Sequence, residues 1–582
     1  CFFMAFCALS GAKGMDIKMN KSGEKLTLLP FGENYQGLMC CAANLVNDFG
    51  MESADGCMLS TNGFTMWLQK SPAGGSVSFQ LEETAPLGKL LVWNYNRIAE
   101  DGTDYTLCGL RSIEIYHSID GKQWVELQGK GYPYCLQKAT GKNDMQPTNL
   151  EGGGVIDFGG VTARYIRLAW KGQPGVYNYD SENLFDRSFG LAKLRLYCGT
   201  GLYTRPASAW TGLLERRDGW AGADGVYSTP FNGVDNEPNH TRTLLMFGDT
   251  FIGSRIPGTD KRSADTIMIN NSGCILKEGT PDVDQAEFLY RKQEDGTPKS
   301  LILPDQKALG IENREPFFWG QDSMILHGRY YAFPLIVRED PEGVEGYQFA
   351  VEGPAFLSAP VENGEVLWDK MEQSRCPLFY RDTDGTELVF GAAVFQNTVE
   401  AKAPDPDGYL YIYGYKPEYI EKNLYAARIK AEDFPQWDKV EYYDGKTWRP
   451  EIEKAACLCR NISCEMSFSP YFGKLYEGKY IMVFTEFTNS PIVACRIADS
   501  PVGPFSDSIR LYHCPEPELG YSIYTYNAKA HPHLSEPGRL LVSYNANACS
   551  MAANQELAMI YSPRFIEVCE VCEGKEEHEE FR

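Results

Sequence analysis

The sequence predicts an all-β protein of two domains. Its 582 residues exceed what one hydrophobic core usually serves. The chain contains 34 Tyr, 30 Phe and 10 Trp together with 56 Gly and 33 Pro, which favours short strands joined by tight turns over long helices. We place the domains at residues 27–198 and 199–568, between an unassigned segment 1–26 and an acidic tail 569–582.

The first domain is predicted to be an antiparallel β-sandwich. Apolar residues alternate along IEIYHS at 113–118 and YIRLAW at 165–170, as they do in strands that bury one face. The tetrapeptide IDGK at 119–122 has Asp and Gly in the positions that a β-turn favours.

The order of segments in this domain carries a family resemblance. The segments are ANLVNDFGM, TMWLQ, VWNYN, IEIYHSIDGKQW, DFGGVTARYIRL and GLAKLRLY. In this order they resemble the discoidin, or coagulation-factor type C, family. The resemblance implies a jelly-roll sandwich that binds carbohydrate, and it allows a structural Ca²⁺ in this domain. A spacer that binds nothing stays open, because a fold does not determine a function.

An internal repeat follows residue 200. Five times a turn precedes an apolar strand, at residues 243, 330, 409, 480 and 540, and a further strand stands before and after each. Three matching strands in five copies predict a five-bladed β-propeller. The spacing between successive copies of the apolar strand falls from 87 to 60 residues. Because these spacings exceed those of compact blades, we assign the additional residues to loops at the rim of a binding site.

Charge and cysteine content indicate which partners and which cellular compartment to expect. With 55 basic and 78 acidic residues the formal charge is −23, which repels phosphate backbones and anionic membrane surfaces. We therefore expect neither a nucleic-acid nor a membrane partner. The 18 scattered Cys favour a reducing, cytoplasmic compartment. The apolar tract 1–10 leaves two alternatives open: a truncated signal sequence of a secreted protein, or upstream codons before Met15.

The first strand of each propeller blade lines the central channel, so polar residues in these strands converge. The polar residues at these positions are Asp224, Asp322, Asn397, Glu465 and His531. Asp249 directly follows the apolar run LLMFG. Burying a carboxylate there costs free energy unless the carboxylate has a partner or a catalytic role.

Glycoside cleavage needs one protonated and one ionised carboxyl group, and clustered carboxyls raise one another's pKa. We therefore predict catalytic roles for Asp224, Asp249, Glu465 and Asp322. Turn formation is an equal alternative for Asp224, which stands beside Gly225.

Substrate binding is predicted for residues near these acids. The residues are Trp220, Trp319, Asn397, His531 and Tyr526. The aromatic rings offer faces to a sugar, although blade packing is the commoner role of any single ring. The pair His531 and His533 leaves a metal site open, but no third ligand is evident, and we expect a channel histidine and no metal.

The propeller carries a second resemblance. WAGADGVYS, LLMFGDTF, NNS, WGQD, CEMSFS, and AHPHL with LVSYNAN are similar to segments of bacterial propeller proteins long described as domains of unknown function. One branch of that group comprises endo-acting glycoside hydrolases on D-arabinan. The resemblance spans roughly 205–568 and implies catalytic roles for Asp224 and Asp249, which 24 residues with the insertion FNGVDNEPNHTR separate in this chain.

The predicted function is therefore a glycoside hydrolase that acts on a polysaccharide or oligosaccharide, a furanoside such as arabinan among the candidates, without a required cofactor. Two alternatives remain. One is a glycan-binding protein without catalysis. The other is a metal-dependent hydrolase or esterase that uses the two histidines.

Overall fold

The computed structural model describes residues 24–31, 42–47, 51, 61–70, 74–142, 147–148, 150–311, 315–342, 348–418 and 421–572. The chain divides into two compact units, Cys1–Gly201 with Val571–Arg582, and Leu202–Glu570. The predicted all-β class is confirmed: among the described residues the only α-helices are the short α1 (Ser208–Leu214) and α2 (Met551–Glu556). The tract 1–10, Met15 and the tail 573–582 lie outside the described residues.

The first unit is the β-sandwich that its alternating pattern predicts. Its strands are β1 (Lys25–Leu26), β2 (Leu29–Phe31), β3 (Trp67–Lys70), β4 (Gly74–Asn94), β5 (Ser112–Ser118), β6 (Val125–Glu126), β7 (Tyr134–Cys135), β8 (Ile156–Lys171) and β9 (Ser188–Cys198). The main path is β1-β9-β4-β8-β5-β6. Strand β4 pairs with β2 and β8 in its first half and with β8 and β9 in its second, and its register shifts allow it to bend.

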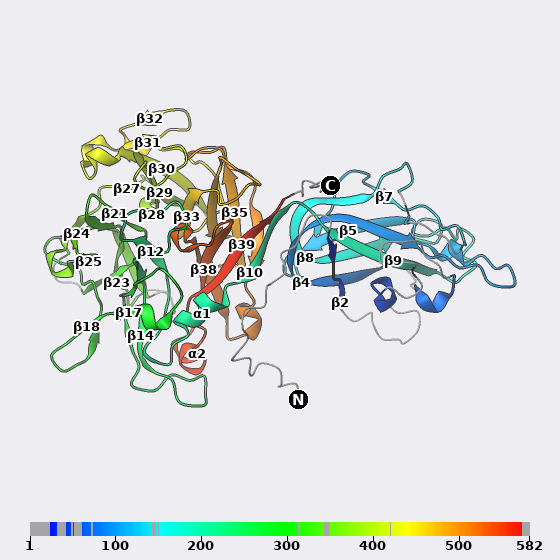
Figure 1. The fold of residues 1–582 in the computed structure, drawn as a ribbon, viewed down its shortest axis with the longest axis horizontal. Coiled ribbons are helices and arrows are strands. Elements are labelled where there is room, and N and C mark those ends of the chain that lie inside the picture. Colours follow the sequence, from blue (N-terminus) through cyan, green and yellow to red (C-terminus); the bar gives the residue numbers. More distant parts are fainter. Residues whose placement is uncertain are drawn as a thin grey trace, which may run out of the picture. The chain divides into compact units, whose positions relative to one another are not determined.

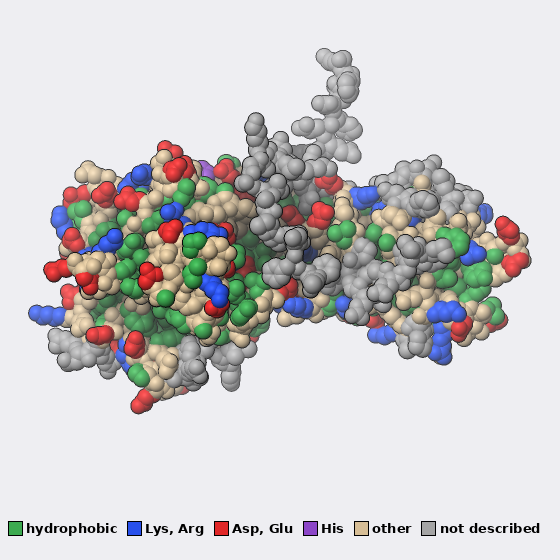
Figure 2. Space-filling model, turned by 90° about the horizontal axis from the view of Figure 1, so that it is seen from below, with side chains coloured by type: hydrophobic (Ala, Val, Ile, Leu, Met, Phe, Trp, Pro, Cys, Tyr) green, Lys and Arg blue, Asp and Glu red, His purple; other side chains and the backbone are tan. Residues whose placement is uncertain are grey.

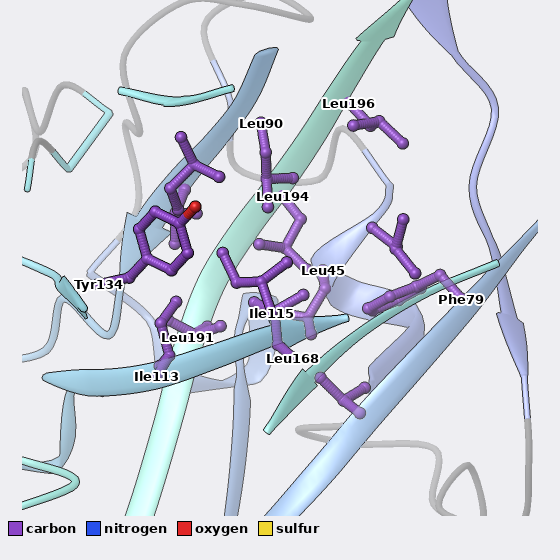
Figure 3. Packing of buried hydrophobic residues seen from close by; sticks show 14 of the residues in the cluster. Leu45, Phe79, Leu90, Ile113, Ile115, Tyr134, Leu168, Leu191, Leu194 and Leu196 are labelled. Atoms are coloured by element: carbon purple, nitrogen blue, oxygen red, sulfur yellow. The ribbon is translucent and has the colours of Figure 1, made fainter. Parts of the chain in front are cut away.

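The core of the sandwich lies between these strands. Leu45, Phe79, Ile115, Leu168 and Leu194 are each at most 1% exposed, and Figure 3 shows their side chains pointing toward one another. In β5 the isoleucines are buried while the residues between them are half-buried, which confirms the predicted alternation. Each such side chain contributes roughly 1.5–3 kcal/mol of hydrophobic stabilisation.

The second unit is the propeller, and its described residues contain five blade sheets. From the innermost strand outward, the first blade contains β12 (Tyr227–Pro230), β13 (Thr243–Phe247), β16 (Ser272–Leu276) and β17 (Ala286–Leu289), and the second contains β21 (Ser323–Leu326), β22 (Arg329–Ala332), β24 (Phe349–Glu362) and β26 (Glu372–Arg375). The third contains β28 (Glu387–Asn397), β29 (Tyr409–Glu418), β30 (Glu421–Lys430) and β31 (Glu441–Tyr443), and the fourth contains β33 (Met466–Pro470), β34 (Tyr480–Thr485), β35 (Ile492–Ala498) and β36 (Ile509–His513). The last contains β37 (Ile523–Ala530), β38 (Arg539–Ala548), β39 (Arg564–Val571) and β10 (Gly201–Pro206).

Shorter strands extend these sheets or form small sheets beside them. They are β11 (Asp218–Ala223), β14 (Thr250–Ser254), β15 (Ile267–Ile269), β18 (Arg291–Lys292), β19 (Pro298–Lys299), β20 (Pro316–Trp319), β23 (Leu335–Glu339), β25 (Glu365–Val366), β27 (Phe379–Arg381) and β32 (Trp448–Arg449). The sheet β11-β14-β15 adjoins the first blade, because β12 follows β11 along the chain and β14 follows β13.

The ring of blades closes through the two ends of the unit. The innermost strands contact one another in chain order, β12 with β21, β21 with β28, β28 with β33 and β33 with β37. Strand β10 completes the last blade by pairing with β39, and Figure 1 shows the two strands side by side. Leu541 and Phe565 of that blade share a core with Phe247 of the first blade and Trp220 of β11 (Asp218–Ala223).

Three boundaries differ from the sequence-based expectation. Strand β37 ends at Ala530, so His531 follows the strand. Strand β28 begins at Glu387, so Asn397 stands at its far end. Strand β39 runs to Val571, so Cys569 belongs to a blade and not to an acidic tail.

The surface carries its charges in a dispersed way. On the face seen in Figure 2, Asp and Glu side chains are scattered over the propeller with Lys and Arg between them. Among the helices of the described residues, none combines the length and the apolar character that crossing a bilayer requires.

Candidate active site

Asp224 and Asp249 lie where the chain passes between two sheets. The chain leaves β11 and enters β12 at Asp224, and it leaves β13 and enters β14 at Asp249. The backbone N–H of Asp224 donates to the carbonyl of Asp249 at 3.1 Å, and that of Gly248 donates to the carbonyl of Asp224 at 2.9 Å. The 24 residues between the acids form the hairpin of β12 and β13, so the insertion at 231–242 lies at the opposite end from the acids.

The glycine beside each acid is needed for this geometry. Gly225 has φ of +63°, a conformation that residues with a side chain rarely adopt. A Cβ atom at Gly248 would lie 2.3 Å from Oδ1 of Asp224, so any other residue would force the Asp224 carboxyl to move. The paired DG and GD of the sequence therefore place two carboxyls next to each other.

Asp224 accepts hydrogen bonds from two phenols. The hydroxyl groups of Tyr526 and Tyr561 donate to its Oδ2 at 2.7 and 3.0 Å. Burial raises the pKa of Asp224, and the two phenol donors act in the opposite direction by stabilising the carboxylate. The side chain of Asp224 remains half-buried, so it reaches solvent.

Asp249 has weaker hydrogen-bond support. Nδ2 of Asn270 donates to its Oδ1 at 3.3 Å, and the nearby indole of Trp319 acts to lower the pKa of the same carboxyl group. Burial, and then the nearby charge of Asp224, raise the pKa of Asp249 to about 8. At neutral pH the coupled pair of carboxyls therefore retains a proton, which the pKa of about 8 assigns to Asp249.

Glu465 approaches the pair from the fourth blade. It directly precedes β33, is half-buried, and accepts a hydrogen bond from the Ser463 hydroxyl at 3.1 Å. Burial raises the pKa of Glu465, and the charge of Asp224 raises it further. The structure thus brings together three of the four predicted acids, on two blades.

Asp322, the fourth predicted acid, occupies a different environment. It is 8% exposed and forms an ion pair with Nζ of Lys529 at 2.9 Å. The backbone N–H groups of Ser323 and Val394 donate to it at 3.0 and 2.7 Å. With its oxygens occupied, Asp322 ties strands of three blades together.

His531 is a buried structural residue. Its two ring nitrogens hydrogen-bond the hydroxyls of Ser228 at 2.7 Å and Ser543 at 2.8 Å, and the residue has no exposed surface. Burial lowers the pKa of His531, so the ring is neutral. Its neighbour His533 pairs instead with Asp235 at 2.7 Å. The two histidines therefore hydrogen-bond different residues.

Two further predicted substrate contacts are also buried. Trp220 is 2% exposed, packs against Phe247 and donates from Nε1 to the Ser272 hydroxyl at 3.0 Å, so it belongs to the core. Asn397 is 2% exposed and lies at the far end of β28. Trp319 and Tyr526 are half-buried and contact the acids, so they are the two predicted ligand-binding residues that the structure brings to the site.

Sequence reasoning missed three residues that hold the acids. Asn545 brackets Asp224, because its Oδ1 accepts from Gly225 N–H at 3.1 Å and its Nδ2 donates to the Ala223 carbonyl at 3.4 Å. Asn545 and Asn270 stand within the motifs LVSYNAN and NNS, which was the available signal. Tyr561 lies 337 residues from Asp224 in a loop after α2 and carried no signal.

The chain is similar to several solved structures. A Bacteroides ovatus protein provisionally named a hydrolase is 21% identical, with a TM-score of 0.48, over 63% of this chain and 90% of that one. An α-L-arabinofuranosidase from Podospora anserina, solved with cellotriose, is 14% identical with a TM-score of 0.29, over 60% and 91% of the two chains. A CBM32 module from Clostridium perfringens, solved with GalNAc-β-1,3-galactose, is 11% identical with a TM-score of 0.19, over 30% and 100%.

No curated protein matches the chain. A family model does match the propeller: it is described as a domain of unknown function, DUF5005, and covers residues 208–571, more than half of the chain. This protein therefore belongs to the DUF5005 family.

Proposed function

We propose that the propeller is a glycoside hydrolase whose chemistry takes place at Asp224, Asp249 and Glu465. The observation that carries the proposal is the meeting of these three half-buried carboxyls, none of which forms an ion pair within the described part of the chain. Buried carboxylates that serve structure are normally paired with a cation. Carboxyls that share one negative charge instead supply an acid and a base together.

In the proposed reaction the protonated Asp249 donates its proton to the glycosidic oxygen as the bond from that oxygen to the anomeric carbon breaks. The ionised Asp224 either attacks the anomeric carbon or takes a proton from an attacking water. In both cases the oxygen of one water ends on the anomeric carbon. A proton returns to the acid in the course of the turnover, so the site is restored.

The remaining groups have supporting roles in the proposal. Glu465, whose pKa is raised by burial and then by the charge of Asp224, forms a hydrogen bond with a sugar hydroxyl. The half-buried ring of Trp319 lies beside Asp249 and offers a face to the sugar ring. As the substrate class we propose a polysaccharide or oligosaccharide, with furanosides such as arabinan first, from the resemblance to arabinan-cleaving propellers. The sandwich would hold the same glycan.

The experiment compares the natural glycosidic bond with an activated one. Asp249→Asn removes the proton donor and should lower turnover of a cleaved glycan by about 10²–10⁴-fold. Aryl glycosides with a dinitrophenol leaving group need no proton, so the same variant should retain most of its activity on them. Equal losses on both substrates would assign Asp249 to another role. A glycan panel that is bound but recovered intact would favour a binding protein instead.

A further inference from the structure

A buried arginine lies behind one of the phenols that contact Asp224. Arg262 is 3% exposed and stands in the segment that joins β14 to β15. Arginine is seldom buried without an opposite charge, because removing a guanidinium from water costs free energy. The carboxylate closest to it in sequence, Asp260, pairs with Arg255 at 3.6 Å. The burial of Arg262 therefore needs other partners and a reason.

Backbone carbonyls of two segments surround this guanidinium. Its Nη1 donates to the carbonyl of Ala221 at 2.6 Å, its Nε to that of Asn554 at 3.2 Å and its Nη2 to that of Ala558 at 2.8 Å. Ala221 belongs to β11, the strand that leads into Asp224. Asn554 lies in α2 and Ala558 in the loop after it, which leads to Tyr561. One side chain thus joins the strand of the acid to the loop of its phenol donor.

The same two segments are in close contact at Gly222. A Cβ atom there would lie 2.1 Å from the carbonyl oxygen of Tyr561 and 3.2 Å from Nη2 of Arg262. Any side chain at this position would therefore push the loop away from β11. Gly222 is the first glycine of the motif WAGADG, so the motif serves this contact as well as the turn at Asp224.

An aromatic ring connects the cation to the phenol. Cζ of Arg262 lies 3.9 Å from the centroid of the Phe251 ring, and Phe251 meets Tyr561 edge to face with 5.2 Å between the ring centroids. The hydroxyl of Tyr561 then donates to Oδ2 of Asp224 at 3.0 Å. Each step from Arg262 to Asp224 is therefore a direct contact.

We infer that Arg262 is a positioning residue of the active site, which holds Tyr561 where its hydroxyl donates to Asp224. The inference rests on the proposed function of Asp224. A guanidinium suits this place because its donors form a rigid planar fork that satisfies carbonyls of two segments at once. Lysine would keep the charge but could not reproduce this planar set of donors.

A double-mutant cycle separates this role from general stabilisation. Arg262→Lys should lower kcat on a cleaved glycan about tenfold, the factor expected for Tyr561→Phe, with KM unchanged. The double variant should be no slower than Tyr561→Phe alone, because both changes remove the same contribution. The matched control is Arg496→Met in the fourth blade, where the arginine also donates to two carbonyls, and it should leave kcat unchanged. A wild-type kcat in Arg262→Lys, additive losses or a loss confined to KM would overturn the inference.

A second readout does not need hydrolysis. In the full chain with 3-fluorotyrosine at position 561, Asp224→Asn should shift the ¹⁹F resonance, since the phenol donates to that carboxylate. After Arg262→Lys or Gly222→Ala the same change should no longer shift it, because the phenol has already left Asp224. A resonance that still responds to Asp224→Asn in both variants would overturn the inference. A wild type that cleaves no glycan but shows the expected ¹⁹F pattern would reject the proposed reaction and support the positioning of Tyr561 by Arg262.

Discussion

Two carboxyl environments in the same propeller lead to opposite consequences. Asp322, directly before β21, is nearly inaccessible and its charge is matched by Lys529 at 2.9 Å. Where the chain passes between the first blade and the sheet of β11 and β14, Asp224 and Asp249 are half-buried beside each other, with phenol, amide and indole groups as partners. A cationic partner makes a buried acid part of the framework. Neutral partners leave its proton available for chemistry.

The largest expected effect is a loss of turnover, and it distinguishes the environment of Asp224 from that of Asp322. Asp224→Asn removes the charge that raises the pKa of both other acids, so turnover of a cleaved glycan should fall by about 10³-fold or more. The free energy of unfolding should change little, because an amide still accepts from both tyrosines. Steady-state kinetics and urea unfolding of the same preparation measure the two quantities. An Asp224→Asn protein with wild-type turnover would remove Asp224 from the mechanism.

Asp322 should respond in the opposite manner. Asp322→Asn leaves the Lys529 ammonium buried without its counter-charge, which should lower the free energy of unfolding by about 3–5 kcal/mol. Urea unfolding monitored by tryptophan fluorescence gives this number. Asp369→Asn, at a carboxyl whose side chain is 93% exposed, is the matched control and should change it by less than about 0.5 kcal/mol. A fully stable but inactive Asp322→Asn protein would reverse the comparison.

Asp249 should make stability depend on pH. Its folded-state pKa of about 8 lies above the value of 3.8 for a free side chain, so between these values the folded state binds more protons than the unfolded state. This group therefore lowers stability as pH rises from about 4 to about 8. Asp249→Asn should flatten the profile and raise the Tm at pH 8, as measured by differential scanning calorimetry. A profile identical to that of the wild type would place the proton elsewhere.

The smallest expected effect concerns the support of Asp224. Tyr561→Phe removes one of two phenol donors, so the pKa of Asp224 should rise and the acidic limb of the kcat/KM profile should move to higher pH. Turnover should fall about tenfold, since Tyr526 still donates. Tyr443→Phe, on a peripheral strand, serves as the control. A loss of activity without a change in the pH profile would assign Tyr561 to packing alone.

The sequence predicts the fold well because both patterns behind it are local. Strand alternation appears within six residues, and the blade repeat appears wherever a turn precedes an apolar run. The pair Asp224 and Asp249 was also predictable, because each acid stands beside a glycine that the close approach of the two chain segments requires.

The composition of the site was harder to predict. Trp220 and Trp319 look alike in sequence, yet one belongs to the core and the other contacts Asp249. His531 was misplaced because β37 ends at Ala530, after a register shift between Tyr526 and Lys529 that no local pattern reveals. Partners such as Tyr561 depend on tertiary packing between segments hundreds of residues apart.

The most direct test of the central claim is hydrolysis of a glycan panel in water labelled with ¹⁸O, read by mass spectrometry. The wild type should release shortened glycans with one ¹⁸O at each new reducing end, and the Asp322→Asn protein that remains folded should do the same. The Asp224→Asn variant should leave the glycans intact. Unlabelled, intact glycans after incubation with the wild type would contradict a hydrolase at these acids, and labelled products from Asp224→Asn would show that the reaction takes place elsewhere.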